Sequence, residues 1–452
     1  MATLADLTES DVVAISEAAG DPDWLRDRRQ SAFKALSDLA WPTPKVEEWR
    51  HTDPRRVDLS RQLRSSGGSE VAARPSGIVG VLDKRAVTVR IIDGEVVEAS
   101  VAPDAAAQGV VASDLATAAA EHPDLVRDEL GGVVGAEDAF TAANLAAFTG
   151  GAFVHVPADV TLDAPITVTV QVSQTGTHLP RLLLHVGAHA RAQLYLDHSG
   201  GADATVVEVV EMVAEQGAQL RVASTQDWGE GIAHVAWHGA SARRDADVRS
   251  LEATFGGDTV YVRPEMGLDG AGANGELYGV YYTSAEQRVE HRCLTHHNAS
   301  HTSSDQIYKG ALQGSSRAVW FGNIRIEPHA KATTSDETNR NLILTEGAKA
   351  DSIPFLEILT SDVIACGHHS SVGQVDEMQL FYLESRGIPR PEAARLLVFG
   401  FFKEVLDRVD LQGVTDTVLS EIEGELRNAP TALMDQRRNR QQTGADPVTA
   451  GA

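Results

Sequence analysis

Cysteine is scarce in this chain, since Cys293 and Cys366 are the only two among 452 residues. Two thiols this far apart in sequence give no disulfide framework, so we expect a reducing compartment, the cytosol. The first residues, MATLADLTESDVV, contain no basic segment followed by an apolar run, and no secretory signal is predicted. Apolar runs approaching the roughly 18 residues of a membrane span are also absent, so we expect no membrane partner.

Aromatic and basic residues are in short supply as well. Aromatic side chains make up 5% of a chain that is 42% hydrophobic, so a large core must consist mainly of Val, Leu, Ile and Ala. The 39 Lys and Arg residues are outnumbered by 64 Asp and Glu residues, which gives a formal net charge of −25. Such an acidic chain is a poor candidate for binding nucleic acid, because the phosphate backbone selects for positive charge.

The N-terminal region, residues 1–75, is predicted to be helical and to end in a linker. Apolar residues recur at helical spacing from Glu9 to Leu39, with a break at Gly20-Asp21-Pro22, where Asp21 is predicted to cap the second helix. In the segment KVEEWRHTD we expect Trp49 to anchor the packing and the charged residues to pair at the surface. Arg61 to Pro75 is rich in polar residues, Gly and Ser, which indicates a flexible connector.

Short strand patterns dominate residues 76–376, with a helical interlude near residues 113–148 whose last part is expected to pack against the strands. Long helices are missing between the strands from Gly151 to Gly373, which disfavours alternating strands and helices. A parallel β-helix is favoured over a sandwich, because stacked small aliphatic side chains explain the low aromatic content. The turns between strands are predicted at Gly187-Ala188, Gly217-Ala218, Gly239-Ala240, Gly310-Ala311 and Gly347-Ala348.

Residues 377–427 return to helical periodicity, and residues 428–452 form a polar tail that we expect to be disordered. One helix is predicted from Glu377 to Ser385 and another from Pro391 onward. The second helix carries Phe399, Phe401 and Phe402. These aromatic residues are either part of the core or a docking surface for a partner protein.

Two stretches combine thiol and imidazole groups, the composition of a metal site. In EHRCLTHHNASH, strand alternation prevents Cys293, His296, His297 and His301 from all converging without a turn, and we predict a polar run that faces solvent rather than a metal site. The second stretch holds Cys366 beside the pair His368 and His369. Either it is a metal site, or Cys366 is a small buried hydrophobic residue and the histidines cap the end of a strand.

Five ordered motifs resemble the SufB/SufD family of iron–sulfur cluster assembly proteins, most closely its SufD members. The motifs are WPTPKVEEWRHTD, GGAFVHVPADVTLDAPI, TTSDETNRNLIL, PFLEILTSDVIACGHHSSVG and DEMQLFYLESRGI. The resemblance implies a mainly β fold, with a right-handed parallel β-helix core flanked by N-terminal and C-terminal helical regions. It also implies pairing with a SufB-like subunit through the ends of the β-helices, and with a SufC-like ATPase through the C-terminal helices.

In SufD-like proteins a histidine of the Cys-x-His segment is implicated as a cluster ligand at the SufB interface, and the matching positions are Cys366 and His368. Two departures affect this match: the segment from Asp362 to Cys366 is one residue longer than in some relatives, and His369 adds a second imidazole. Either departure could transfer the ligand role to His369 or remove it. On a strand these two histidines face opposite sides, so only one is expected to reach a shared site.

The resemblance implies no catalytic residue and no permanently bound cofactor, only iron or a cluster shared transiently with a partner. ATP is expected on the partner, since no G-x-x-x-x-G-K-[S/T] loop is present. A SufB-type scaffold that holds its own cluster is disfavoured by the two cysteines, although a homodimer is also compatible with the sequence. A β-helix carbohydrate-active enzyme is disfavoured because acidic residues are scattered rather than paired along one face.

Overall fold

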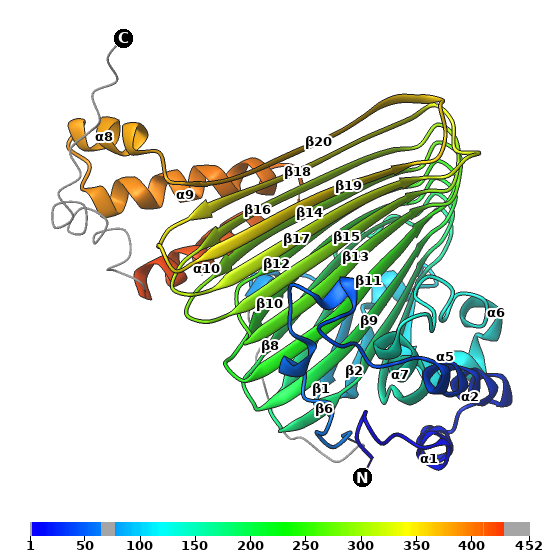
Figure 1. The fold of residues 1–452 in the computed structure, drawn as a ribbon. Coiled ribbons are helices and arrows are strands. Elements are labelled where there is room, and N and C mark those ends of the chain that lie inside the picture. The colour runs from blue at the N-terminus through cyan, green and yellow to red at the C-terminus, as the bar shows by residue number, and fades with distance from the viewer. Residues whose placement is uncertain (1, 65–76, 410, 429–452) are drawn as a thin grey trace.

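The computed structural model describes residues 2–64, 77–409 and 411–428. Two long sheets lie against each other, and each sheet takes alternate strands of the central part of the chain (Figure 1). Successive strands therefore belong to opposite sheets, and each strand pairs in parallel with the strand one coil earlier. This is the topology of a parallel β-solenoid with helices toward both ends of the chain, so the predicted fold class is confirmed and the sandwich is excluded.

One sheet has the order β2–β1–β5–β8–β10–β12–β14–β16–β18–β20. Its strands are β1 (Val87–Ile92), β2 (Glu95–Val101), β5 (Ile166–Val172), β8 (Arg191–Gly200), β10 (Gln219–Trp228), β12 (Asp247–Thr254), β14 (Asn274–Thr283), β16 (Ser303–Leu312), β18 (Thr333–Ile343) and β20 (Val363–Gln374). Within this sheet only the pair of β1 and β2 is antiparallel.

The other sheet has the order β19–β17–β15–β13–β11–β9–β7–β4–β3. Its strands are β3 (Val111–Asp114), β4 (Gly150–Val156), β7 (Pro180–Val186), β9 (Ala204–Ala214), β11 (Ile232–Ala242), β13 (Thr259–Leu268), β15 (Arg288–His297), β17 (Arg317–Ile326) and β19 (Lys349–Ile358). A short strand, β6 (Gly176–His178), pairs with β9 beside this path. The pair of β3 and β4 is antiparallel.

The strands are apolar along most of their length because both of their faces are covered. In β9, which reads ATVVEVVEMVA, every residue is buried. Side chains on one face fill the lumen between the sheets, where Val, Leu and Ala stack from coil to coil. The opposite faces pack against the N-terminal helices on one sheet and the C-terminal helices on the other.

The predicted turns are correct only in part. Gly217 has a positive φ of 67° in the turn between β9 and β10, and Gly187 and Gly347 also lie between strands. However, Gly239 lies inside β11 and Gly310 inside β16, which contradicts the sequence-based turns at these two positions. Both glycines instead make room for neighbours: a side chain would collide with Val133 and Val134 at Gly239, and with Tyr281 at Gly310.

The N-terminal helices are α1 (Glu9–Ala19), α2 (Asp23–Asp38), η1 (Glu47–Trp49) and η2 (Pro54–Arg56). Asp21 does not cap α2, contrary to the prediction; its carboxylate accepts a hydrogen bond from the buried Arg29 at 2.6 Å. Trp49 is the predicted anchor, buried and stacked on Tyr261 of the solenoid with ring centroids 4.2 Å apart. The predicted connector overlaps residues 65–76, which lie outside the described part of the chain.

Helices α3 (Gly77–Gly80), α4 (Pro103–Ala106), α5 (Leu115–Glu121), α6 (Pro123–Val126) and α7 (Ala139–Ala147) cover the first coils. The last three form the predicted interlude, and α7 is buried along its whole length. A buried ion pair links this region to strands β7 and β9: Arg181 donates a hydrogen bond to Glu211 at 2.7 Å. The Glu211 carboxylate also accepts hydrogen bonds from the backbone N–H groups of Gly131 and Val134.

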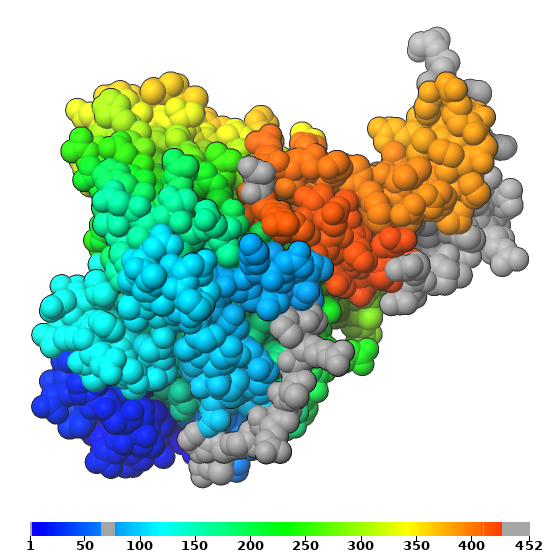
Figure 2. Space-filling view, turned by 180° about the vertical axis from the view of Figure 1, so that it is seen from behind, coloured from blue at the N-terminus to red at the C-terminus, as the bar shows by residue number. Residues whose placement is uncertain are grey.

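The C-terminal helices are α8 (Glu377–Ser385), α9 (Arg390–Leu406) and α10 (Val414–Asn428). Gly387, with a φ of 85°, follows α8 as the predicted glycine stop. Helices α9 and α10 lie along the outer face of the sheet that contains β14 and β16, whereas α8 and the start of α9 stand out from the solenoid (Figures 1 and 2). The predicted tail from residue 429 onward lies outside the described residues.

Candidate functional site

The last coil of the solenoid is built differently from the coils before it. Strand β20 pairs with β18 and β19 pairs with β17, and among the described residues neither has a partner on its outer edge. Most residues of β20 are exposed, whereas earlier strands are largely buried. The exposed apolar residues of this terminal coil are Phe355, Ile358, Leu359, Ile364 and Val372. Unpaired backbone beside exposed apolar side chains is a surface suited to strand-edge pairing with another protein.

All three predicted ligand candidates lie on β20, and the register separates them into two faces. Cys366 and His368 stand opposite Ser335 and Glu337, whose side chains are buried. His369 belongs to the other face, where its Nε2 lies 3.5 Å from Asp336 in a partly exposed pair. The prediction that the two histidines face opposite sides is confirmed, and Cys366 shares its face with His368.

The segment between Asp362 and Cys366 contains a bulge at Ile364. Thr333 pairs with Val363 and the next residue, Thr334, pairs with Ala365, so Ile364 is left without a register partner and is 70% exposed. A bulge absorbs one residue without shifting the strand that follows it. The register from Ala365 to Gln374 is therefore continuous, and His368 and His369 lie on opposite faces of β20.

The electrostatics of this face favour the protonated forms of its acids. Burial, with the carboxylates of Glu337 and Asp336 beside it, raises the pKa of the Cys366 thiol to about 11. Burial also raises the pKa of Glu337 to about 8, and Asp336 adds to the effect. The Cys366 thiol is thus a weak ligand on its own, and a nearby cation would be needed to favour the thiolate.

Replacing Glu337 by glutamine is expected to remove part of the pH dependence of stability. The folded pKa of about 8 exceeds the unfolded reference of 4.5, so Glu337 destabilises the fold progressively as pH rises between these values. The free energy of unfolding of Glu337→Gln minus that of the unsubstituted chain should therefore be about 3 kcal/mol larger at pH 8 than at pH 5. Denaturant titration at both pH values measures this difference, and parallel pH profiles would contradict it.

The stretch from Glu290 to His301 was predicted to face solvent, and this prediction is wrong. Glu290, His291, Cys293 and His297 are buried, because β15 is covered on both faces. Cys293 points into the lumen, and burial raises its pKa beyond the ordinary range of a thiol. His296 is half-buried and pairs with Glu327 at 2.7 Å. The prediction that the thiol and imidazoles of this stretch do not converge is consistent with these positions.

The predicted docking aromatics lie mostly inside the fold. Phe402 is fully buried, and Phe401 packs under the Lys309 ammonium, whose nitrogen lies 4.6 Å from the ring centroid. Phe399 is half-buried beneath Arg395. The apolar residues that these helices do expose are Met378, Phe381, Tyr382 and Leu396. Met378, Phe381 and Tyr382 are spaced three and four residues apart on α8, so they share one helix face, and only Leu380 of this helix is buried. This spacing could have indicated an exposed apolar face from the sequence.

Metal-type donor groups converge at two places among the described residues, and neither includes the terminal coil. One is His198, Glu208 and His238; the other is Glu129, His185 and Glu215. In the second group both carboxylates already pair with Arg243. It is therefore an ion-pair network around an arginine.

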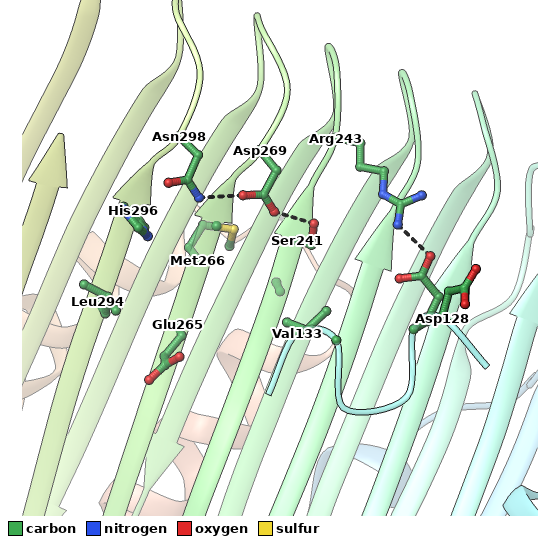
Figure 3. A pocket seen from close by; sticks show the side chains of 14 residues that line it. Asp128, Val133, Ser241, Arg243, Glu265, Met266, Asp269, Leu294, His296 and Asn298 are labelled. Carbon is green, nitrogen blue, oxygen red and sulfur yellow. Dashed lines mark hydrogen bonds and ion pairs between the residues drawn. The ribbon is translucent and has the colours of Figure 1, made fainter. Parts of the chain in front are cut away.

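A polar hollow of about 380 Å³ lies on the outer side of β11, β13 and β15 (Figure 3). Its acidic groups are largely engaged: Asp269 accepts hydrogen bonds from Ser241 and Asn298, Glu129 pairs with Arg243, and Glu265 pairs with Arg263. A glycosidase needs one carboxyl to donate a proton and another to act as base or nucleophile. Carboxylates held by arginine and amide donors are poorly suited to either role.

The fold defines the chain as a parallel β-solenoid protein with helical ends and an exposed last coil. Residues 169–401 match the family model described as SUF system FeS cluster assembly, SufBD core domain. Residues 3–168 match the model of the SufBD protein N-terminal region. The chain belongs to the SufBD family of iron–sulfur cluster assembly proteins.

Individual relatives agree with this assignment. The chain is 37% identical over 297 residues to an iron–sulfur cluster assembly SufBD family protein of Mycobacterium leprae, covering 64% of this chain and 75% of that protein. It is 28% identical over 425 residues to the iron–sulfur cluster assembly protein SufD of Bacillus subtilis, covering 92% and 97% of the two chains. No helix in the described ranges has the length and apolar character needed to cross a membrane.

Proposed function

We propose that this chain is the SufD-type subunit of a cytosolic SUF complex. It pairs with a SufB-type subunit through its terminal coil and binds a SufC-type ATPase through its C-terminal helices. It acts without catalysing a reaction of its own, and ATP is hydrolysed by the partner. Iron or a nascent cluster is the cargo, held transiently at the interface with the SufB-type subunit.

The observation that carries this proposal is the terminal coil, where Cys366 and His368 share one face beside an unpaired strand edge. A single imidazole can complete a site whose other ligands come from a partner, and ligands divided between two chains let a subunit movement open the site. The alternative of a SufB-type scaffold that holds its own cluster is less favoured, because Cys293 is buried in the lumen and only Cys366 lies on the terminal coil.

Replacing His368 by alanine is expected to lower the cluster yield of the assembled complex several-fold, because the interface loses its nitrogen ligand. The chain and its variants are co-expressed with SufB-type and SufC-type partners, and iron and sulfide are measured per complex under anaerobic conditions. Size-exclusion chromatography should show an intact complex, since the side chain is exposed.

Two matched variants make this test specific. His369→Ala removes the neighbouring imidazole, already paired with Asp336, and Ser370→Ala truncates another exposed residue of the same strand. Both should retain the cluster yield. A loss with His369→Ala alone would transfer the role to the other face, and no loss with either histidine variant would reject the site. A stable stoichiometric cluster on the isolated chain would reject the SufD-type role.

A further inference from the structure

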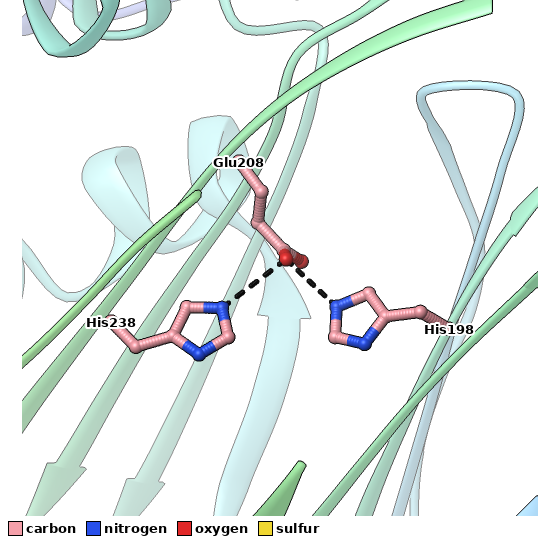
Figure 4. A group of neighbouring side chains, drawn as sticks. All are labelled: His198, Glu208 and His238. Atoms are coloured by element: carbon pink, nitrogen blue, oxygen red, sulfur yellow. Dashed lines mark hydrogen bonds and ion pairs between the residues drawn. The ribbon is translucent and has the colours of Figure 1, made fainter. Parts of the chain in front are cut away.

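A cluster of histidines and glutamates lies inside the solenoid, several coils below the terminal coil. His198 comes from β8, Glu208 from β9, and His234 and His238 from β11. All four side chains are buried in the lumen between the two sheets, and Glu208 pairs in register with Ala236, between the two histidines of β11. Figure 4 shows His198, Glu208 and His238 of this cluster. None of them belongs to the surfaces assigned to partners or cargo.

Three imidazole nitrogens converge on one carboxylate oxygen. The Nε2 atoms of His198, His234 and His238 lie 2.7, 3.2 and 3.3 Å from Oε2 of Glu208. An oxygen with two lone pairs cannot accept three well-directed hydrogen bonds. The arrangement instead brings three nitrogen donors and one oxygen donor together. The ligand atoms of His198, Glu208 and His238 lie within 4.8 Å of one another, and His234 joins them through its 3.2 Å contact with Glu208.

In His198 and His238, the Nδ1 atom, which points away from Glu208, has its own hydrogen-bond acceptor. Nδ1 of His198 lies 2.9 Å from the carbonyl oxygen of Thr225, and Nδ1 of His238 lies 2.8 Å from the Glu252 carboxylate. Each Nδ1 therefore donates a proton outward, which leaves the Nε2 lone pair directed at Glu208. This pattern of an outer carboxylate or carbonyl fixing the ring is characteristic of metal-bound histidine. Nδ1 of His234 is buried and has no hydrogen-bond partner.

Two carboxylates, Glu208 and Glu252, are buried at this cluster. A divalent cation bound among the imidazole nitrogens would balance the charge of both carboxylates.

We propose that His198, Glu208, His234 and His238 form a structural binding site for a divalent transition-metal ion, with Zn²⁺ as the best-fitting ion. Three imidazoles and one carboxylate match its preferred ligands, and a closed set of four ligands suits tetrahedral coordination. The ion links β8, β9 and β11 across the lumen. Because the ligands are fully buried, it enters while the chain folds.

The test measures metal in the full-length chain purified from cells grown with added Zn²⁺ or Co²⁺. We expect about one ion per chain, visible-region ligand-field bands for the Co²⁺ form, and an X-ray absorption shell of nitrogen and oxygen without sulfur. Glu208→Gln and His238→Gln should each lower the bound metal at least tenfold. His297→Gln, which replaces another buried histidine of the same solenoid, should retain it.

A folded chain without stoichiometric metal would overturn the proposal, as would a sulfur-containing shell or full retention of the ion by both ligand variants. Should those variants fail to fold, Glu252→Gln gives an independent measure, since Glu252 is not one of the proposed ligands and contacts the outer nitrogen of His238. It should weaken metal affinity about 10–100-fold. Unchanged affinity in Glu252→Gln would count against the site.

Discussion

Replacing Glu211 by alanine is expected to lower the free energy of unfolding by about 3–5 kcal/mol, because Arg181 would keep a buried charge without its partner. Both side chains of this pair are 0% exposed. Glu211 also accepts hydrogen bonds from the backbone of Gly131 at 2.8 Å and Val134 at 3.1 Å, so the loop before α7 would lose its attachment. Urea titration followed by circular dichroism measures the change.

A matched control exists in the same region of the solenoid. Arg243 pairs with Glu129 and Glu215, but its side chain is 39% exposed and solvent screens both pairs. Arg243→Ala should therefore cost only about 0–1 kcal/mol. The double variant Arg181→Met with Glu211→Leu should recover part of the loss, since it leaves no unpaired charge. An equal cost for Glu211→Ala and Arg243→Ala would contradict the buried pair as the cause.

Replacing Phe381 by aspartate is expected to weaken binding of the proposed SufC-type ATPase about 100-fold, because it places a charge in the apolar docking surface. Phe381 is 63% exposed on α8, beside Met378 and Tyr382, on a helix that stands out from the solenoid (Figure 2). Exposed aromatic residues at the centre of an interface commonly contribute 2 kcal/mol or more, about thirtyfold or greater in affinity. Titration calorimetry with the purified ATPase measures the loss.

The control for this prediction lies at the other proposed interface. Phe355 on β19 has a comparable exposure of 48% and belongs to the terminal coil. Phe355→Asp should leave ATPase binding unchanged and weaken pairing with the SufB-type subunit. If both variants lose ATPase binding equally, general destabilisation is the cause; if neither does, α8 is not the docking helix.

Much of the architecture follows from local patterns that the sequence displays directly. Helical periodicity locates α1, α2, α8 and α9, and the run of short apolar strands indicates a solenoid because no helices separate them. Gly239 and Gly310 were wrongly predicted to mark turns, because they lie inside strands and make room for side chains that are distant in sequence. Whether a glycine turns the chain or admits a neighbour depends on contacts that are remote in sequence.

The lumen is where sequence reasoning fails most. Polar residues such as His291 suggest a solvent-facing strand, yet both faces of the solenoid strands are covered and the polar groups must find partners inside. The cluster around Glu208 joins three strands, so no short motif reveals it. The available signal was the placement of His234 and His238 four residues apart on one strand face, surrounded by apolar residues.

The bulge at Ile364 separates the face of the candidate ligands from the length of the segment before them. Because pairing with β18 resumes at Ala365 and continues to Gln374, the register of this part of β20 determines which way Cys366 and His368 point. A residue inserted between Cys366 and His368 would place these two side chains on opposite faces of the strand.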